Sequence, residues 1–319
     1  MPDSSKSPLV VQTLEIRRRV LDEDHPDMLM SVNNLGALYR HQGRYAEAEP
    51  LYVRVLEARE RVVGQDHPET LTSMNNLALV YRAQGRYDEA EPLFVDALEI
   101  GQRVLGEEHP STLTSMNNVA LLYHDQGRHD QAEPLYAKAL ETRRRVLGKE
   151  HRKTLVSMYN LAHLYLDQRR YEEAESLARE LVALRQETAR PKVTDVASSL
   201  NLLADILVHR GDPQAAEPLL RECLEIRRAA LPEDDRLIAK TQSLLGGCLT
   251  TLGKYAEAES LLLESNAVLR SVQAGNDDLA REVCQKLVDL YEAWDKPERA
   301  ADWHARLETT TREFHPAEP

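Results

Sequence analysis

Residues 67–108 read HPETLTSMNNLALVYRAQGRYDEAEPLFVDALEIGQRVLGEE, and this stretch decides the fold because the rest of the chain repeats it. The next copy begins at His109 with HPSTLTSMNNVALLYHDQGRHDQAEPLYAKALETRRRVLGKE, and the preceding copy begins at His25. The period is therefore 42 residues. A fixed period in this range indicates a repeat array, in which stacked units bury one continuous core.

The first half of the unit predicts a helix, called helix A below. Its apolar residues Met74, Leu77, Ala78 and Tyr81 recur at three- and four-residue intervals and so share one face. Pro68 suits a first helical position, and His67 before it is excluded from the α region and becomes the N-cap. Gly85 can adopt the left-handed conformation that ends a helix.

The second half of the unit predicts another helix, called helix B below. Ala90, Phe94 and Leu98 form its apolar stripe, and Gly106 ends it. Each unit is therefore expected to be a helical hairpin. Arg17 to Arg19 and Arg143 to Arg145 lie at the ends of two B helices, where we expect solvated side chains near the negative end of the helix dipole.

The spacing Met74-x2-Leu77-Ala78-x2-Tyr81, followed by Ala90-x3-Phe94, resembles the tetratricopeptide consensus with Met in place of Trp. The longer 42-residue form resembles the repeats of kinesin light chains and of similar arrays in bacterial signalling proteins. This resemblance implies an all-α fold, a right-handed α-solenoid of helix-turn-helix repeats. The resemblance is much less informative about function than about fold.

The repeat register predicts the organisation of the whole chain. Leu9 and Leu14 match Leu51 and Leu56 one period later, so the chain begins with a helix B that lacks its helix A. The expected segments are a disordered N-terminus (1–8), this orphan helix (9–24), seven repeats (25–66, 67–108, 109–150, 151–192, 193–234, 235–276 and 277–307) and a frayed tail (308–319).

Composition narrows the classes of function. A net charge of −13 over 319 residues argues against a nucleic-acid partner, whose binders carry a basic face. No apolar run is long enough for a membrane span, and the N-terminus does not read as a signal peptide, so a cytoplasmic protein is expected. Cys223, Cys248 and Cys284 replace apolar residues of other repeats and are expected to be small buried hydrophobes.

Catalytic and metal-binding motifs are not found. Residues one repeat apart, such as His67 and His109, lie on successive hairpins and cannot converge on one ion. We therefore expect these histidines to cap the starts of helices and not to bind a metal. The segment 247–254, GCLTTLGK, lacks the spacing and hydroxyl of a phosphate loop and coincides with a turn between helices. We therefore expect no enzyme, no cofactor and no metal site.

The family resemblance places the binding surface on the concave side, which the A helices line. Carried over to this chain, the groove positions are Asn33 and Arg40; Asn75, Leu79 and Arg82; Asn117, Leu121 and His124; Tyr159 and His163; and Asn201. The recurring asparagine could pair an extended peptide backbone, or could bond neighbouring helices to each other. We favour binding for the first Asn of each pair and a structural role for the second.

The expected partner is a protein or an extended peptide, acidic and with an apolar anchor, because Arg40 and Arg82 attract acids and Leu79 and Leu121 accept apolar groups. The lysines with which related arrays hold chaperone tails are missing. Two alternatives remain open. The array could regulate a larger signalling enzyme, a protein kinase or a nucleotide-binding ATPase, or it could self-associate through residues 9–21.

Overall fold

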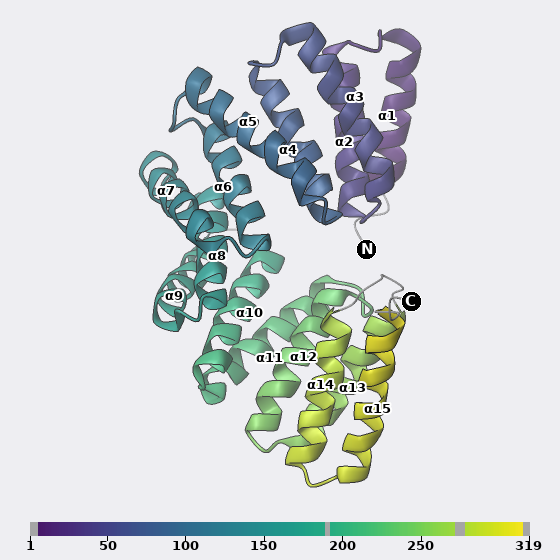
Figure 1. The fold of residues 1–319 in the computed structure, drawn as a ribbon, viewed down its shortest axis with the longest axis vertical. Coiled ribbons are helices and arrows are strands. Elements are labelled where there is room, and N and C mark those ends of the chain that lie inside the picture. Colours follow the sequence, from purple (N-terminus) through teal and green to yellow (C-terminus); the bar gives the residue numbers. More distant parts are fainter. Residues whose placement is uncertain (1–5, 189–191, 272–277, 315–319) are drawn as a thin grey trace. The chain divides into compact units, whose positions relative to one another are not determined.

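The computed structural model describes residues 6–188, 192–271 and 278–314 (Figure 1). Over these ranges the chain forms fifteen helices and no strand, which confirms the all-α prediction. The helices are α1 Lys6–Val20, α2 Pro26–His41, α3 Tyr45–Val63, α4 Pro68–Ala83, α5 Tyr87–Leu105, α6 Pro110–Asp125, α7 His129–Leu147, α8 Arg152–Asp167, α9 Tyr171–Glu187, α10 Val193–Arg210, α11 Pro213–Ala230, α12 Arg236–Thr251, α13 Tyr255–Ser271, α14 Asp278–Ala293 and α15 Pro297–Phe314.

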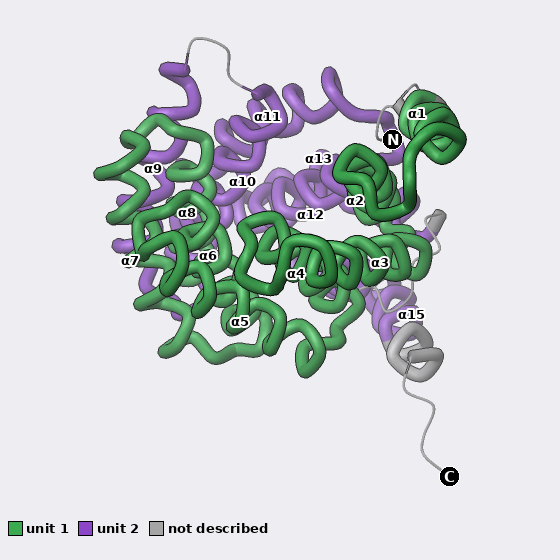
Figure 2. Tube along the Cα trace, turned by 90° about the horizontal axis from the view of Figure 1, so that it is seen from above, with its two compact units in different colours: residues 1–164 green, residues 165–319 purple. Residues whose placement is uncertain are grey.

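The chain divides into two compact units, residues 1–164 and 165–319, and the division falls within α8 (Figure 2). In the first unit each helix from α1 to α6 packs on the next along the chain, and α4 also contacts α6. In the second unit each helix from α9 to α14 packs on the next, and α12 contacts both α10 and α14. Each unit thus consists of stacked hairpins, the arrangement that the period predicts.

The repeat core is built from the apolar stripes of the two helices. Tyr52, Leu71 and Val80 share one cluster of side chains that are at most 8% exposed. The next cluster repeats the arrangement one period later with Phe94 and Leu122. Neighbouring clusters follow one another along the first unit, so its core is continuous and no repeat closes its core alone.

Histidine caps the start of four A helices, α2, α4, α6 and α8, as predicted. The ring Nδ1 of His67 accepts a hydrogen bond from the backbone N–H of Glu69 at 3.3 Å, and His25, His109 and His151 accept equivalent bonds at 3.2 Å. These bonds satisfy one of the backbone donors that every helix start leaves without a partner. At the opposite end, Gly106 follows helix B with a φ of +90° and a ψ of 161°, a positive-φ conformation that glycine adopts without strain but that is not the left-handed helical one.

The helices at the two chain ends differ in length from the prediction. Helix α1 begins at Lys6, inside the segment expected to be disordered, and ends at Val20. Helix α15 continues to Phe314, although a frayed tail was expected from residue 308. The loss of the periodic apolar signal after Leu307 does not stop the helix, because polar residues also propagate one. Residues 1–5 and 315–319 lie outside the described ranges.

An arginine joins helix B to the following helix A at five junctions, and it is buried at three of them and half-buried at the other two. Its guanidinium donates to the backbone carbonyl ten residues ahead and to the hydroxyl fourteen residues ahead. The pairs are Arg17 with Ser31, Arg59 with Ser73, Arg143 with Ser157, Arg185 with Ser199 and Arg227 with Thr241. At the α5–α6 junction Gly101 stands in this position.

Arg143 shows that the predicted solvated role was wrong for this series. It is 3% exposed, and burial lowers the pKa of its guanidinium to about 10. It donates to Ser157 Oγ at 2.6 Å and to the carbonyl oxygen of Leu113 at 2.8 Å. Arg145, two residues later, is exposed as expected and pairs with Glu108.

The three cysteines are buried free thiols, in agreement with the prediction of small core residues. Burial raises the pKa of each thiol, and that of Cys248 reaches about 11. Because the thiolate is the reactive form, such side chains are poor nucleophiles and poor metal ligands. Across the described helices, none is long and apolar enough to cross a bilayer.

Candidate functional site

The predicted groove positions lie on helices α2, α4, α6, α8 and α10. Those of the first unit, from Asn33 on α2 to His163 on α8, form what we call the A-helix surface. It consists of Asn33, Arg40, Asn75, Leu79, Arg82, Asn117, Leu121, His124, Tyr159 and His163. Asn201 lies on α10 and belongs to the second unit, so it is described separately.

The first asparagine of each pair was expected to face a ligand, but Asn75 and Asn117 are buried and Asn33 is half-buried. Asn75 is only 8% exposed. Its Nδ2 donates to Leu71 O and to Ser115 Oγ, both at 2.8 Å, and its Oδ1 accepts from Asn118 Nδ2 at 2.7 Å. The amide therefore joins two A helices and has no donor left for a peptide backbone.

The other first asparagines make similar bonds. Asn33 Oδ1 accepts from Asn76 Nδ2 at 2.9 Å, and Asn117 Oδ1 accepts from Ser157 Oγ at 3.2 Å. In the second unit Asn201 is 6% exposed, and its Oδ1 accepts from the guanidinium of Arg227 at 3.4 Å. The asparagine ladder is thus mainly a structural network, in which the first Asn of one pair accepts from the second Asn of the next, as Asn33 does from Asn76 and Asn75 from Asn118.

Arg82 is paired within the protein. Its guanidinium Nε lies 2.5 Å from a carboxylate oxygen of Asp125, which is on the next helix A. Both side chains are about one quarter exposed, at 25% and 26%. An acidic ligand at this point would compete with Asp125, so Arg82 is a weaker anchor than the sequence suggested.

Arg40 is the equivalent residue one repeat earlier, and its surroundings differ. The position that corresponds to Asp125 is Ala83, which cannot accept a hydrogen bond. Arg40 is half-buried beside Tyr52, and its Nε makes no hydrogen bond to the described residues. Over the same ranges no carboxylate pairs with Arg40.

Aromatic rings gather where the third and fourth repeats meet. The ring centroids of His124 and His163 are 5.5 Å apart, and those of Tyr159 and His163 are 6.3 Å apart. His129 also meets His124 at 5.6 Å. All four side chains are half-buried, so this part of the A-helix surface offers flat apolar faces with polar edges.

Leu79 and Leu121, the predicted apolar anchors, are also half-buried. Leu79 packs against the cluster that contains Phe94 and Met116, so only part of its side chain is left for a ligand. The A-helix surface therefore combines one arginine without a carboxylate partner, two partly covered leucines and a group of aromatic rings.

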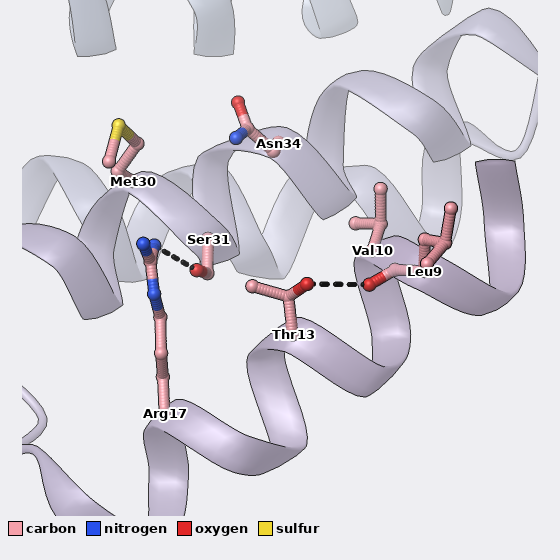
Figure 3. A pocket seen from close by; sticks show the side chains of 7 residues that line it. All are labelled: Leu9, Val10, Thr13, Arg17, Met30, Ser31 and Asn34. Carbon is pink, nitrogen blue, oxygen red and sulfur yellow. Dashed lines mark hydrogen bonds between the residues drawn. The ribbon is translucent and has the colours of Figure 1, made fainter.

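A pocket that sequence reasoning did not identify lies between α1 and α2, and we call it the terminal groove. It has a volume of about 240 Å³ and is lined by Leu9, Val10, Thr13, Arg17, Met30, Ser31 and Asn34. Figure 3 shows two hydrogen bonds along its floor, from Arg17 to Ser31 Oγ and from Thr13 Oγ1 to the carbonyl oxygen of Leu9. The 42-residue register could have located it, since Val10, Thr13 and Ser31 match Tyr52, Val55 and Ser73, which are buried in the next repeat.

Known proteins resemble this chain in fold. A solved structure of BtubC (BKLC) from P. vanneervenii is 24% identical, with a TM-score of 0.59, and the match covers 72% of this chain and 92% of that chain. The apo form of RapI is 14% identical, with a TM-score of 0.65, and covers 89% of this chain and 97% of that one. At these identities the likeness shows the fold alone.

A putative kinesin light chain from Podosopora anserina, with nearly identical TPR-like repeats, is 28% identical. Its TM-score is 0.55, and the match covers 66% of this chain and 99% of that chain. A search of curated proteins finds no match. The tetratricopeptide repeat model matches residues 27–100, 72–144, 112–187 and 195–271, which together span most of the sequence. The chain therefore belongs to the tetratricopeptide repeat family.

Proposed function

We propose that this protein is a binding scaffold that holds an extended, acidic peptide segment on the A-helix surface, with Arg40 as the anchoring cation. Membership of a family of protein-interaction repeats supports the general role. The observation that supports the specific site is the difference between Arg40 and Arg82. Only Arg82 has a carboxylate partner on the next helix A, namely Asp125.

Arg40 is a better anchor for an acidic ligand than Arg82, because the Arg82 guanidinium already binds a carboxylate. A guanidinium presents donors in a fixed fork that matches a carboxylate, and a bidentate pair is stronger than a neutral hydrogen bond. At Arg82 the fork is already engaged by Asp125, and a ligand gains only the difference between two similar pairs. At Arg40 no carboxylate of the described residues competes with a ligand for the guanidinium.

The apolar part of the ligand would lie against Leu79 on the next helix A. Packed helices lie about 8–10 Å apart, and an extended peptide advances about 3.3 Å per residue. An acidic residue over Arg40 and an apolar residue over Leu79 would therefore be separated by about three positions. The buried asparagines do not pair the peptide backbone in this arrangement, which departs from the expectation drawn from the sequence.

The test is a peptide-display selection against wild type and against Ala83→Asp. The substitution places a carboxylate in the register that Asp125 occupies relative to Arg82, so it should occupy Arg40 while leaving every native side chain of the surface in place. Ala83 is exposed, so the fold should tolerate the change. Ala83→Asn is the matched control, with the same shape and no charge.

We expect acidic peptides with an apolar residue about three positions away to be enriched on wild type and on Ala83→Asn. Their affinity for Ala83→Asp should fall at least tenfold, since a charged pair of this kind contributes about 1.5–3 kcal/mol. The same peptides binding equally to Ala83→Asp would show that Arg40 is not the anchor. Enrichment of basic or uncharged peptides alone would reject the acidic ligand.

A further inference from the structure

Helix α1 occupies the position of a helix B. Within the described residues it packs on α2, the helix A of the following repeat, and on no helix A of its own repeat. The following repeat shows what normally fills this place. In that repeat α3 is the helix B, and its Tyr52 and Val55 are 1% and 0% exposed. The ring of Tyr52 lies so close to Gly36 of α2 that an added Cβ would stand 3.1 Å from it.

The corresponding residues of α1 line the terminal groove. Val10 matches Tyr52 and is half-buried, while Thr13 matches Val55 and is exposed. Leu9 is 62% exposed, although its equivalent Leu51 is half-buried. An apolar face that later repeats cover with a helix A is therefore open in the terminal groove.

The groove also contains an asparagine, Asn34, whose equivalents in the next two repeats show which bond it could make. Asn34 is exposed at the rim of the groove. One repeat later, Asn76 donates to Asn33 Oδ1 on the preceding helix A, and Asn118 donates to Asn75 in the same way. Asn34 thus presents an amide that, in later repeats, bonds an asparagine of the preceding helix A.

From these observations we infer that the terminal groove is a docking site for an amphipathic helix of another polypeptide that carries the helix A pattern. The pattern is an asparagine, a large apolar residue two positions later and a small residue directly after that, as in Asn33, Leu35 and Gly36. The asparagine would accept from Asn34, and the small residue would allow close approach to Val10.

The inference extends an interface that the first unit already contains, because the groove continues the contact between α2, α3 and α4. A second copy of this chain is a poorer occupant. Its A helices from α2 to α6 already pack on their own B helices, so one repeat would have to open to supply a helix. The inference does not depend on the peptide site around Arg40, which involves other residues.

The probe for this site is a synthetic peptide of residues 68–85, PETLTSMNNLALVYRAQG, stapled on its solvent-facing side and labelled with a fluorophore. Short isolated helices are marginal in water, so the staple removes the ordering cost. Binding to the full chain would be measured by fluorescence anisotropy.

Thr13→Lys places a charge inside the groove, and Gln12→Lys is the control at an exposed neighbouring position. A second peptide carries Phe in place of Ala78.

We expect saturable binding of the peptide to wild type and to Gln12→Lys, at least tenfold weaker binding to Thr13→Lys, and loss of binding for the Ala78→Phe peptide. Equal affinity for Thr13→Lys and wild type, or no binding to wild type, would overturn the inference. Sedimentation of the unliganded chain provides a second test. A dimer that both Thr13→Lys and the peptide dissociate would assign the groove to a second copy and reject a partner helix.

Discussion

Asn118 donates a hydrogen bond from Nδ2 to Oδ1 of Asn75 over 2.7 Å, and this bond joins the A helices of two successive repeats. The two side chains are 9% and 8% exposed. A buried amide that loses its partner costs more free energy than the bond contributes, because the remaining group is desolvated and has no partner. The pair is therefore a determinant of stability.

Asn75→Ala should lower the free energy of unfolding by about 1–3 kcal/mol, because it leaves Asn118 and Ser115 without their partner. Urea unfolding followed by circular dichroism measures this change. Asn34→Ala is the control: Asn34 follows Asn33, the equivalent of Asn75 one repeat earlier, its side chain is exposed, and the substitution should change stability by no more than about 0.5 kcal/mol. Equal effects of the two substitutions would show that the asparagine network does not stabilise the array.

Arg143 should be the more costly of two neighbouring arginines to replace. Arg143→Met keeps the apolar stem but removes the donors to Ser157 and Leu113, and should destabilise the protein by about 2 kcal/mol. Arg145→Met removes only the exposed pair with Glu108 and should cost less than about 1 kcal/mol. Thermal unfolding of both variants checks the difference. A neutral or stabilising Arg143→Met would mean that the desolvation of the buried charge outweighs its hydrogen bonds.

The fold could be predicted in detail because its determinants are local and repeated. Histidine and proline at the start of helix A, a glycine after each of the two helices and an apolar stripe on both all lie within one 42-residue unit. The junction arginines were also visible in principle, since Arg59 is followed by Ser73 and Arg143 by Ser157 at the same spacing. Arg17 and Arg143 were misread because each begins a run of three arginines, which resembles a solvated helix end.

The site was less predictable because exposure depends on the neighbouring repeat. The sequence places Asn75 and Arg82 on the correct helix, but whether each side chain is available depends on what stands one repeat later. Asn118 and Asp125 lie 43 residues ahead of them and engage them. A comparison of residues separated by 43 positions would have revealed both pairs, and also the absence of a partner for Arg40 at Ala83.

His209 should titrate well above an ordinary histidine. Its hydrogen bond to the Asp205 side chain is the main cause, and it raises the pKa of the imidazole from 6.5 to about 9. Burial and Lys286 oppose this shift. NMR titration of the ring should therefore show a pKa far above 6.5 in wild type and a value closer to 6.5 in Asp205→Asn. A wild-type titration near 6.5 would contradict the pairing.

The pKa of His209 is raised by folding, so the pair stabilises the protein fully below about pH 6.5. This stabilisation declines as the pH rises through about 9. The difference in unfolding free energy between wild type and Asp205→Asn should accordingly be largest in mildly acidic buffer and vanish in alkaline buffer. It should also be small, because His209 is 55% exposed and solvent screens the pair. A difference that grows with pH would have the wrong sign for this interaction.

Asp125→Ala should convert Arg82 into a second anchor for acidic ligands. The substitution removes the carboxylate 2.5 Å from the Arg82 guanidinium and reproduces the arrangement of Arg40 beside Ala83. Peptides with two acidic residues about three positions apart, the spacing of neighbouring helices along an extended chain, should then bind at least tenfold more tightly than to wild type. Peptides with a single acid should gain less.

Fluorescence anisotropy with both peptide classes measures the effect. The affinity of Asp125→Asn, which is neutral but retains an acceptor, should fall between those of wild type and Asp125→Ala. If Asp125→Ala binds neither class more tightly, then Asp125 does not limit the access of ligands to Arg82, and the contrast on which the Arg40 site rests loses its support.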